Sequence, residues 1–179
     1  MSDAGSDELD RRGFIADPDG LAALGMGIDD LSDPDARAFA IRHEHPEFEE
    51  ALDAGIGEID LGNGPVNPRL HLVMHEVVAT QLWDGDPPEV WETAVRLRDM
   101  CYERTEILHM LGRPVSDQIW AAWHDDQPYD RARHVAALRA LPGTWERERS
   151  VSAAKKHDAP RKQARRSARA ARRRNRRPR

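Results

Sequence analysis

Two pairs of side chains in the middle of the chain have the chemistry and the spacing of metal ligands. His71 and His75 are four residues apart, and Glu106 and His109 are three apart. Residues at these spacings share one face of a helix, so each pair can offer two ligands toward one point. Imidazole and carboxylate together suit zinc, iron or manganese. The pattern predicts a divalent-metal site made of His71, His75, Glu106 and His109, or else a polar cluster in a helical core.

The sequence leaves both interpretations of this cluster open. A complete two-metal bundle site needs a second Glu-x-x-His motif and two further Glu residues, which we do not find. Without metal, the histidines would be core residues that bond to carbonyls or to Glu106. In either case we expect the four side chains to lie close together. Gln81 and Arg104 are partners of these ligands or polar residues at helix edges, and the second is the simpler interpretation.

A third group, His43-Glu44-His45, also resembles a ligand sequence. Residues two apart diverge on a helix, however, so a junction between helices is the simpler account of this segment.

The helix that positions His71 and His75 is predicted over residues 67–83. Asn67 can accept hydrogen bonds from the first free N–H groups, and Pro68 loses no bond at the first helical position. Gly85, followed by Pro87 and Pro88, ends the helix. Between these limits apolar residues point in nearly every direction, which is typical of a central helix covered by its neighbours.

The rest of the pattern is helical as well, and we predict an all-α fold, a small bundle of about six helices. Gly112 and Pro114 predict the end of a short helix that starts near residue 103, with a separate helix after Ser116. In that later helix Trp120 and Trp123 are expected to face the core, with a partner groove as the alternative.

Charge divides the chain into unlike parts. Residues 1–60 contain 17 Asp and Glu against four Arg, whereas residues 155–179 contain 13 Lys and Arg against one Asp. We expect an acidic disordered arm over 1–13, a helical domain over 14–145 and a basic tail over 150–179.

The basic tail predicts binding to a nucleic acid or another polyanion. Its cations would release counterions from phosphate backbones without reading bases, and the tail lacks aromatic residues on which bases could stack. A binding module that holds RNA through the tail is the leading function hypothesis, and a metal protein is the alternative. A localisation signal or a merely compositional tail also fits. The candidate residues are Lys155, Lys156, Arg161, Lys162, Arg165, Arg166, Arg169, Arg172, Arg173, Arg174, Arg176, Arg177 and Arg179.

Several classes of protein are disfavoured by the sequence. Cys101 is the single cysteine, so no internal disulfide is expected, and its place on an apolar stripe predicts a buried, unreactive thiol. No signal peptide and no apolar run of about 18 residues is present, which favours a cytoplasmic protein without a membrane span. Phosphate-binding loops, serine elbows and dinucleotide fingerprints are also missing.

Residues 65–113 resemble a bacterial family called domain of unknown function 1841. The resemblance rests on NPRLHLVMHEVVATQLW, the Pro-Pro pair, TAVRLRDM and YERTEILHMLG. The family pattern falls on His71, His75, Gln81, Arg96-Leu97, Arg104, Glu106 and His109.

This chain departs from the family pattern at two positions. Thr105 stands where the family often has His, so the His-Glu-x-x-His motif of zinc hydrolases is incomplete. Cys101 stands where Gly is expected before Tyr102. The resemblance implies a shared fold and carries no activity with it.

Overall fold

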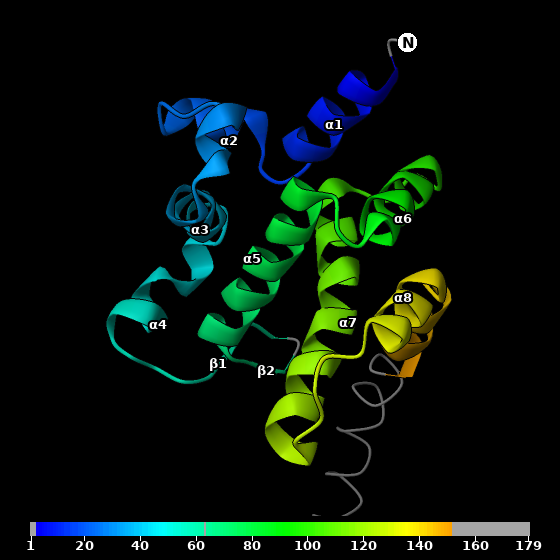
Figure 1. Cartoon of the computed structure of the whole chain (residues 1–179). Coiled ribbons are helices and arrows are strands. Elements are labelled where there is room, and N and C mark those ends of the chain that lie inside the picture. Colours follow the sequence, from blue (N-terminus) through cyan, green and yellow to red (C-terminus); the bar gives the residue numbers. More distant parts are fainter. Residues whose placement is uncertain (1–2, 63, 152–179) are drawn as a thin grey trace, which may run out of the picture. The chain divides into compact units, whose positions relative to one another are not determined.

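The computed structural model describes residues 3–62 and 64–151, and the fold is all-α as predicted (Figure 1). The elements are α1 (Asp3–Gly13), α2 (Pro18–Ala23), α3 (Pro34–His43), α4 (Glu49–Asp53), α5 (Pro68–Asp84), α6 (Pro88–Asp99), α7 (Arg104–Asp125) and α8 (Arg131–Arg139), with 3-10 helices η1 (Ile28–Ser32) and η2 (Pro46–Phe48). Strands β1 (Ile59–Asp60) and β2 (Pro65–Val66) form a minimal antiparallel pair.

Helix α5 is the centre of the fold, as its apolar pattern predicted. Its N-terminus is capped by Asn67, whose side chain accepts from the N–H of Leu70 at 3.1 Å, and its C-cap Gly85 has a left-handed φ of 68°. Helices α1, α3, α4, α6 and α7 all contact it, and Figure 1 shows α7 alongside α5. Burial on several sides explains why a helix with little amphipathic character is stable here.

The break predicted at Gly112 is wrong, because α7 runs without interruption from Arg104 to Asp125. Pro114 lies inside it, where proline forfeits one backbone hydrogen bond. Apolar residues on both sides of the proline are buried, among them Leu111 and Val115, and this burial outweighs the missing bond. At Gly112 a Cβ atom would meet the Cβ of Met74 at 3.7 Å, so the glycine marks close packing of α7 on α5.

The acidic start of the chain, expected to be disordered over 1–13, forms α1 from Asp3 to Gly13. Its last turn is held by the C-terminal end of α5, where Arg11 donates to the carbonyl oxygens of Leu82 and Trp83. The guanidinium of Arg12 lies 4.1 Å from the ring centroid of Trp83. Cations at the negative end of a helix dipole are stabilising, which gives this charged segment a reason to fold.

Two expectations about side-chain burial are also wrong. Trp120 and Trp123 are 60% and 73% exposed instead of facing the core. Cys101 is exposed and adopts a φ of 65°, because it lies in the turn after α6 and not on the buried stripe of that helix.

The described residues divide into two units, one that ends at Arg139 and one that begins at Ala140. The described part of the second unit is helical over 143–151, and Ser150 donates to the carbonyl of Glu146. Within the described ranges, no helix is long and apolar enough to cross a membrane.

Candidate metal centre

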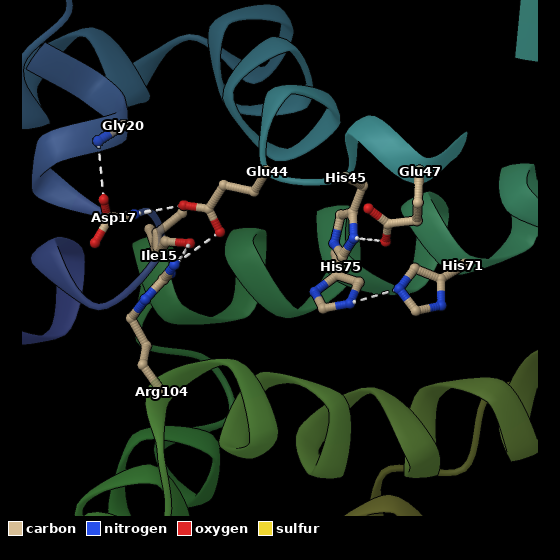
Figure 2. A network of polar contacts seen from close by, with 9 residues as sticks. All are labelled: Ile15, Asp17, Gly20, Glu44, His45, Glu47, His71, His75 and Arg104. Atoms are coloured by element: carbon tan, nitrogen blue, oxygen red, sulfur yellow. Dashed lines mark hydrogen bonds and ion pairs between the residues drawn. The ribbon is translucent and has the colours of Figure 1, made fainter. Parts of the chain in front are cut away.

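His71 and His75 lie one turn apart on α5 and point the same way, as their spacing predicted. Their Nε2 atoms are 3.1 Å apart (Figure 2). His75 is buried and His71 is half-buried. The cap at Asn67 fixes where α5 begins and therefore which face carries the two imidazoles.

Helix α7 brings a third imidazole to the same place. The Nε2 atom of His109 is 3.3 Å from the Nε2 atom of His71, and its ring centroid is 4.9 Å from that of His75. The carbonyl of Thr105 accepts a hydrogen bond from the His109 ring, which leaves Nε2 as the nitrogen with a lone pair.

A fourth imidazole comes from the junction between α3 and η2. The His45 ring centroid lies 4.8 Å from that of His71 and 4.7 Å from that of His75. Its Nδ1 atom is 3.0 Å from a carboxylate oxygen of Glu47, as Figure 2 shows. A carboxylate that orients an imidazole in this way is a common partner of metal-binding histidines. Candidate ligand atoms of His45, His71 and His75 all lie within 4.8 Å of one another.

The environment favours the neutral form of His71, His75 and His109. Burial, and then the neighbouring histidines, lower the pKa of His75 to about 2. Burial, with the charges of His45 and His109, lowers the pKa of His71 to about 4, and burial also lowers the pKa of His109. Burial raises the pKa of Glu47, but its hydrogen bonds and the charges of His45 and His71 produce a net decrease. Neutral imidazole is the form that binds metal.

An ion pair ties the elements of this site together. Arg104 at the start of α7 donates to Glu44 at 2.7 Å and to the carbonyl of Ile15 at 3.3 Å. The other oxygen of Glu44 accepts from the backbone N–H of Asp17 (Figure 2). Glu44 immediately precedes His45, so the ion pair fixes the α3–η2 junction against the helix that carries His109.

Comparison with known proteins agrees with the resemblance found in the sequence. The family model described as Domain of unknown function (DUF1841) matches residues 28–140. The chain belongs to this family. The match extends beyond residues 65–113 on both sides and includes all four histidines. No curated protein and no solved structure matches the chain significantly.

The DUF1841 fold brings together three of the four residues proposed from the sequence. His71 and His75 converge with His45, and His109 joins them through its 3.3 Å contact with Nε2 of His71. Glu106 is not in the convergent group of described residues. Its charge still raises the pKa of His109 against the larger effect of burial. Gln81 lies elsewhere, 3.4 Å from the Nε2 atom of His134.

Sequence reasoning missed His45 in this DUF1841 domain. The His43-Glu44-His45 triplet does lie at a helix junction, and its side chains do diverge: His43 is exposed, Glu44 bonds Arg104, and His45 is buried beside His71. The available signal was His45-Pro46, because a residue before proline leaves the helical region and can turn its side chain away from the preceding helix. The candidate residues of the basic tail, Lys155 to Arg179, lie outside the described residues.

Proposed function

We propose that this DUF1841 protein binds a divalent transition metal, with zinc favoured, through His45, His71, His75 and His109, which we call the histidine cluster. The observation that supports this most strongly is the crowding of nitrogen atoms around His71, whose Nε2 lies 3.1 Å from one imidazole nitrogen and 3.3 Å from another. Tetrahedral zinc with bonds of 2.0–2.1 Å requires ligand nitrogens about 3.3–3.4 Å apart.

Hydrogen bonds alone explain this crowding poorly. Each neutral imidazole carries one N–H. The N–H of His45 is directed to Glu47 and that of His109 to Thr105. At most one of the two close contacts of His71 Nε2 can then hold a proton between its nitrogen atoms, so a hydrogen bond does not account for the other contact. The lowered pKa values of His71 and His75 exclude extra protons near pH 7. A cation among the nitrogens resolves the conflict.

The ligand set also narrows the choice of metal. Carboxylate and water ligands suit manganese, whereas imidazoles suit zinc, copper, nickel and iron. Because the convergent group contains imidazoles and not Glu106, manganese fits less well than it did with the residues proposed from the sequence. Four protein ligands close the coordination sphere of zinc, which is the pattern of a structural site. The role that follows is metal binding that stabilises the fold.

The experiment is zinc titration of the full chain, after dialysis against a chelator, by isothermal titration calorimetry with elemental analysis of the product. We expect one zinc ion per chain. His75→Ala should abolish binding, because it removes one of the four proposed ligands, the buried ring whose Nε2 lies 3.1 Å from that of His71. His43→Ala is the matched control, since His43 is exposed and two residues from a proposed ligand.

Glu106→Gln separates this proposal from the ligand set predicted by the sequence alone. Affinity should stay within a few-fold of the unmodified chain, because Glu106 is not one of the proposed ligands. Absence of zinc binding in the unmodified chain would refute the proposal, and so would equal binding by the His75→Ala variant.

A second proposal concerns the basic tail: we infer that it gives the protein an affinity for RNA or another polyanion. The supporting observation is its charge, 13 Lys and Arg against one Asp over residues 155–179. Binding of a labelled single-stranded RNA should fall steeply between 50 mM and 200 mM salt, as expected for counterion release. Removal of residues 152–179 should abolish binding. Retention of affinity after truncation would show that the tail is not the binding element.

A further inference from the structure

A cavity of about 550 Å³ opens between α5 and the C-terminal half of α7, beside the loop that follows α4. Its apolar walls are Leu70 and Val73 of α5 and Ile119, Ala122 and Trp123 of α7. Val73 is 42% exposed and Trp123 is 73% exposed, so the walls face outward from the core. Small-molecule sites in proteins have volumes of about 300–1,000 Å³.

A second cavity, of about 210 Å³, continues the first along the same two helices. The two share Ile119 and Ala122, and the second extends past Val77 of α5 and Val115 of α7 toward Tyr129. Together they form one elongated apolar depression, which we call the α5–α7 groove. None of the histidine cluster lines it, so it is independent of the metal proposal.

One end of the α5–α7 groove carries a positive charge. Arg69 lines the first cavity, and no carboxylate lines either cavity. Within the described residues the guanidinium of Arg69 has no hydrogen-bond or ion-pair partner. Most other arginines of the 1–139 unit lie against a partner, for example Arg104 on Glu44 and Arg131 on Asp86. A groove with an unpaired cation at one end and apolar walls along its length complements a ligand with an anionic head and an apolar chain.

We propose that the α5–α7 groove binds a medium-chain acyl carboxylate, with the carboxylate on Arg69 and the chain along Val73, Ile119 and Val77. The elongated shape favours a chain over a compact ring. Arg69 is exposed, so its charge adds little to the binding free energy. The acyl chain of the ligand therefore supplies most of the affinity, and the carboxylate fixes the orientation of the ligand.

The test is calorimetric titration of the full chain with hexanoate, octanoate and decanoate below their micelle concentrations, together with octanamide. Affinity should rise about fourfold for each added methylene group. Octanoate should bind up to about fivefold more tightly than octanamide. Arg69→Ala should remove the difference in affinity between octanoate and octanamide, while the dependence on acyl-chain length remains. Arg69→Lys should restore much of the difference between the two ligands. Arg98→Ala is the matched control, because Arg98 is exposed on α6 and lines neither cavity.

Ala122→Trp tests the groove itself. Ala122 is exposed and lines both cavities, so a large side chain there fills the junction without entering the core. Val73→Glu is a second blocking variant, because it places a carboxylate on an exposed wall position. Both should reduce decanoate affinity at least tenfold while circular dichroism stays unchanged.

Three results would each overturn the proposal. The first is affinity that does not depend on chain length. The second is undiminished decanoate binding in both blocking variants. The third is that the unmodified protein does not bind decanoate but self-associates, and that Ala122→Trp abolishes the self-association. This result would identify the groove as an interface between two copies of this chain.

Discussion

At the scale of single residues, Cys101 adopts a backbone conformation with a clear physical cost. Cys101 stands where the resemblance leads us to expect glycine, and its φ is 65°. Side chains with a Cβ atom are disfavoured in this left-handed region by about 1–2 kcal/mol. A glycine would adopt the same turn without that cost, so we expect the residue before Tyr102 to be constrained by backbone geometry and not by chemistry of the thiol.

Cys101→Gly should therefore raise the free energy of unfolding. The gain should be at most about 1 kcal/mol, because glycine also loses more backbone entropy on folding. Chemical denaturation under reducing conditions measures the change. Cys101→Ala keeps the Cβ atom and serves as the control, and an equal gain in that variant would show that removing the thiol, and not relieving the backbone, is responsible.

His134 is a buried histidine outside the cluster, and it links stability to pH. It is 1% exposed, its Nδ1 atom has no hydrogen-bond partner in the structure, and its Nε2 atom is 3.4 Å from Nε2 of Gln81. Burial, followed by the charge of Arg131, lowers its pKa below the usual 6.5. As the pH falls through 6.5, His134 binds a proton in the unfolded chain but remains neutral in the folded protein. The free energy of unfolding therefore decreases as the pH is lowered.

His134→Leu should flatten this part of the pH dependence. We expect the decrease in unfolding free energy between pH 7 and pH 5, measured with urea in the presence of a chelator, to be smaller in the variant than in the unmodified chain. The histidine cluster contributes with the same sign, so the decrease should shrink and not vanish. An unchanged slope would mean that His134 takes up its proton equally in the folded and unfolded states.

At the scale of the elements, the sequence predicts helix ends correctly where they depend on neighbouring residues. It fails where tertiary packing determines whether a helix continues. Asn67 and Gly85 mark the ends of α5 correctly, because a cap and a left-handed exit depend on neighbouring residues alone. Gly112 and Pro114 gave a similar local signal in α7, yet the helix continues through both because residues on either side are buried against α5 and α6.

The same contrast applies to the metal site. The spacing of His71 and His75 predicts a shared face, and the structure confirms it. No periodicity could have related His45 to them, because their contact depends on how the α3–η2 junction packs against α5. Glu106 is outside the converging group of described residues and His45 is inside it, which spacing along the sequence does not reveal.

Gly112→Ala follows from the packing of α7. A Cβ atom at this position would lie 3.7 Å from the Cβ of Met74, which is ordinary van der Waals contact. Alanine in a helix interior is favoured over glycine by about 0.5–1 kcal/mol. We expect the unfolding free energy to rise by about that amount in urea denaturation. Gly112→Leu should instead destabilise the protein, because its larger side chain would separate α7 from α5. A loss of stability with alanine would mean that the helices cannot yield even to one methyl group.

At the scale of the whole molecule, the ligands of the histidine cluster are far apart in the sequence. His45 follows α3, His71 and His75 lie on α5, and His109 lies on α7. An ion that binds all of them joins three segments that the unfolded chain does not hold together. Metal bound at such a site adds its binding free energy to folding, because the unfolded chain offers no preformed site. The Arg104–Glu44 ion pair joins two of these segments without metal, the α3–η2 junction and α7, and α5 packs against both α3 and α7, so the metal-free chain should still fold.

Zinc should therefore raise the melting temperature without being required for folding. At a free zinc concentration about 100 times the dissociation constant, the folded state gains about 2.7 kcal/mol. Differential scanning calorimetry with and without zinc measures the shift, and excess chelator should reverse it. The shift should persist in the His43→Ala variant and disappear in His75→Ala. A chain that is unfolded without zinc would show that the ion pair and the apolar core cannot hold these segments alone. A chain that binds zinc with no change in melting temperature would show that the ion binds folded and unfolded states equally, and so lies outside the histidine cluster.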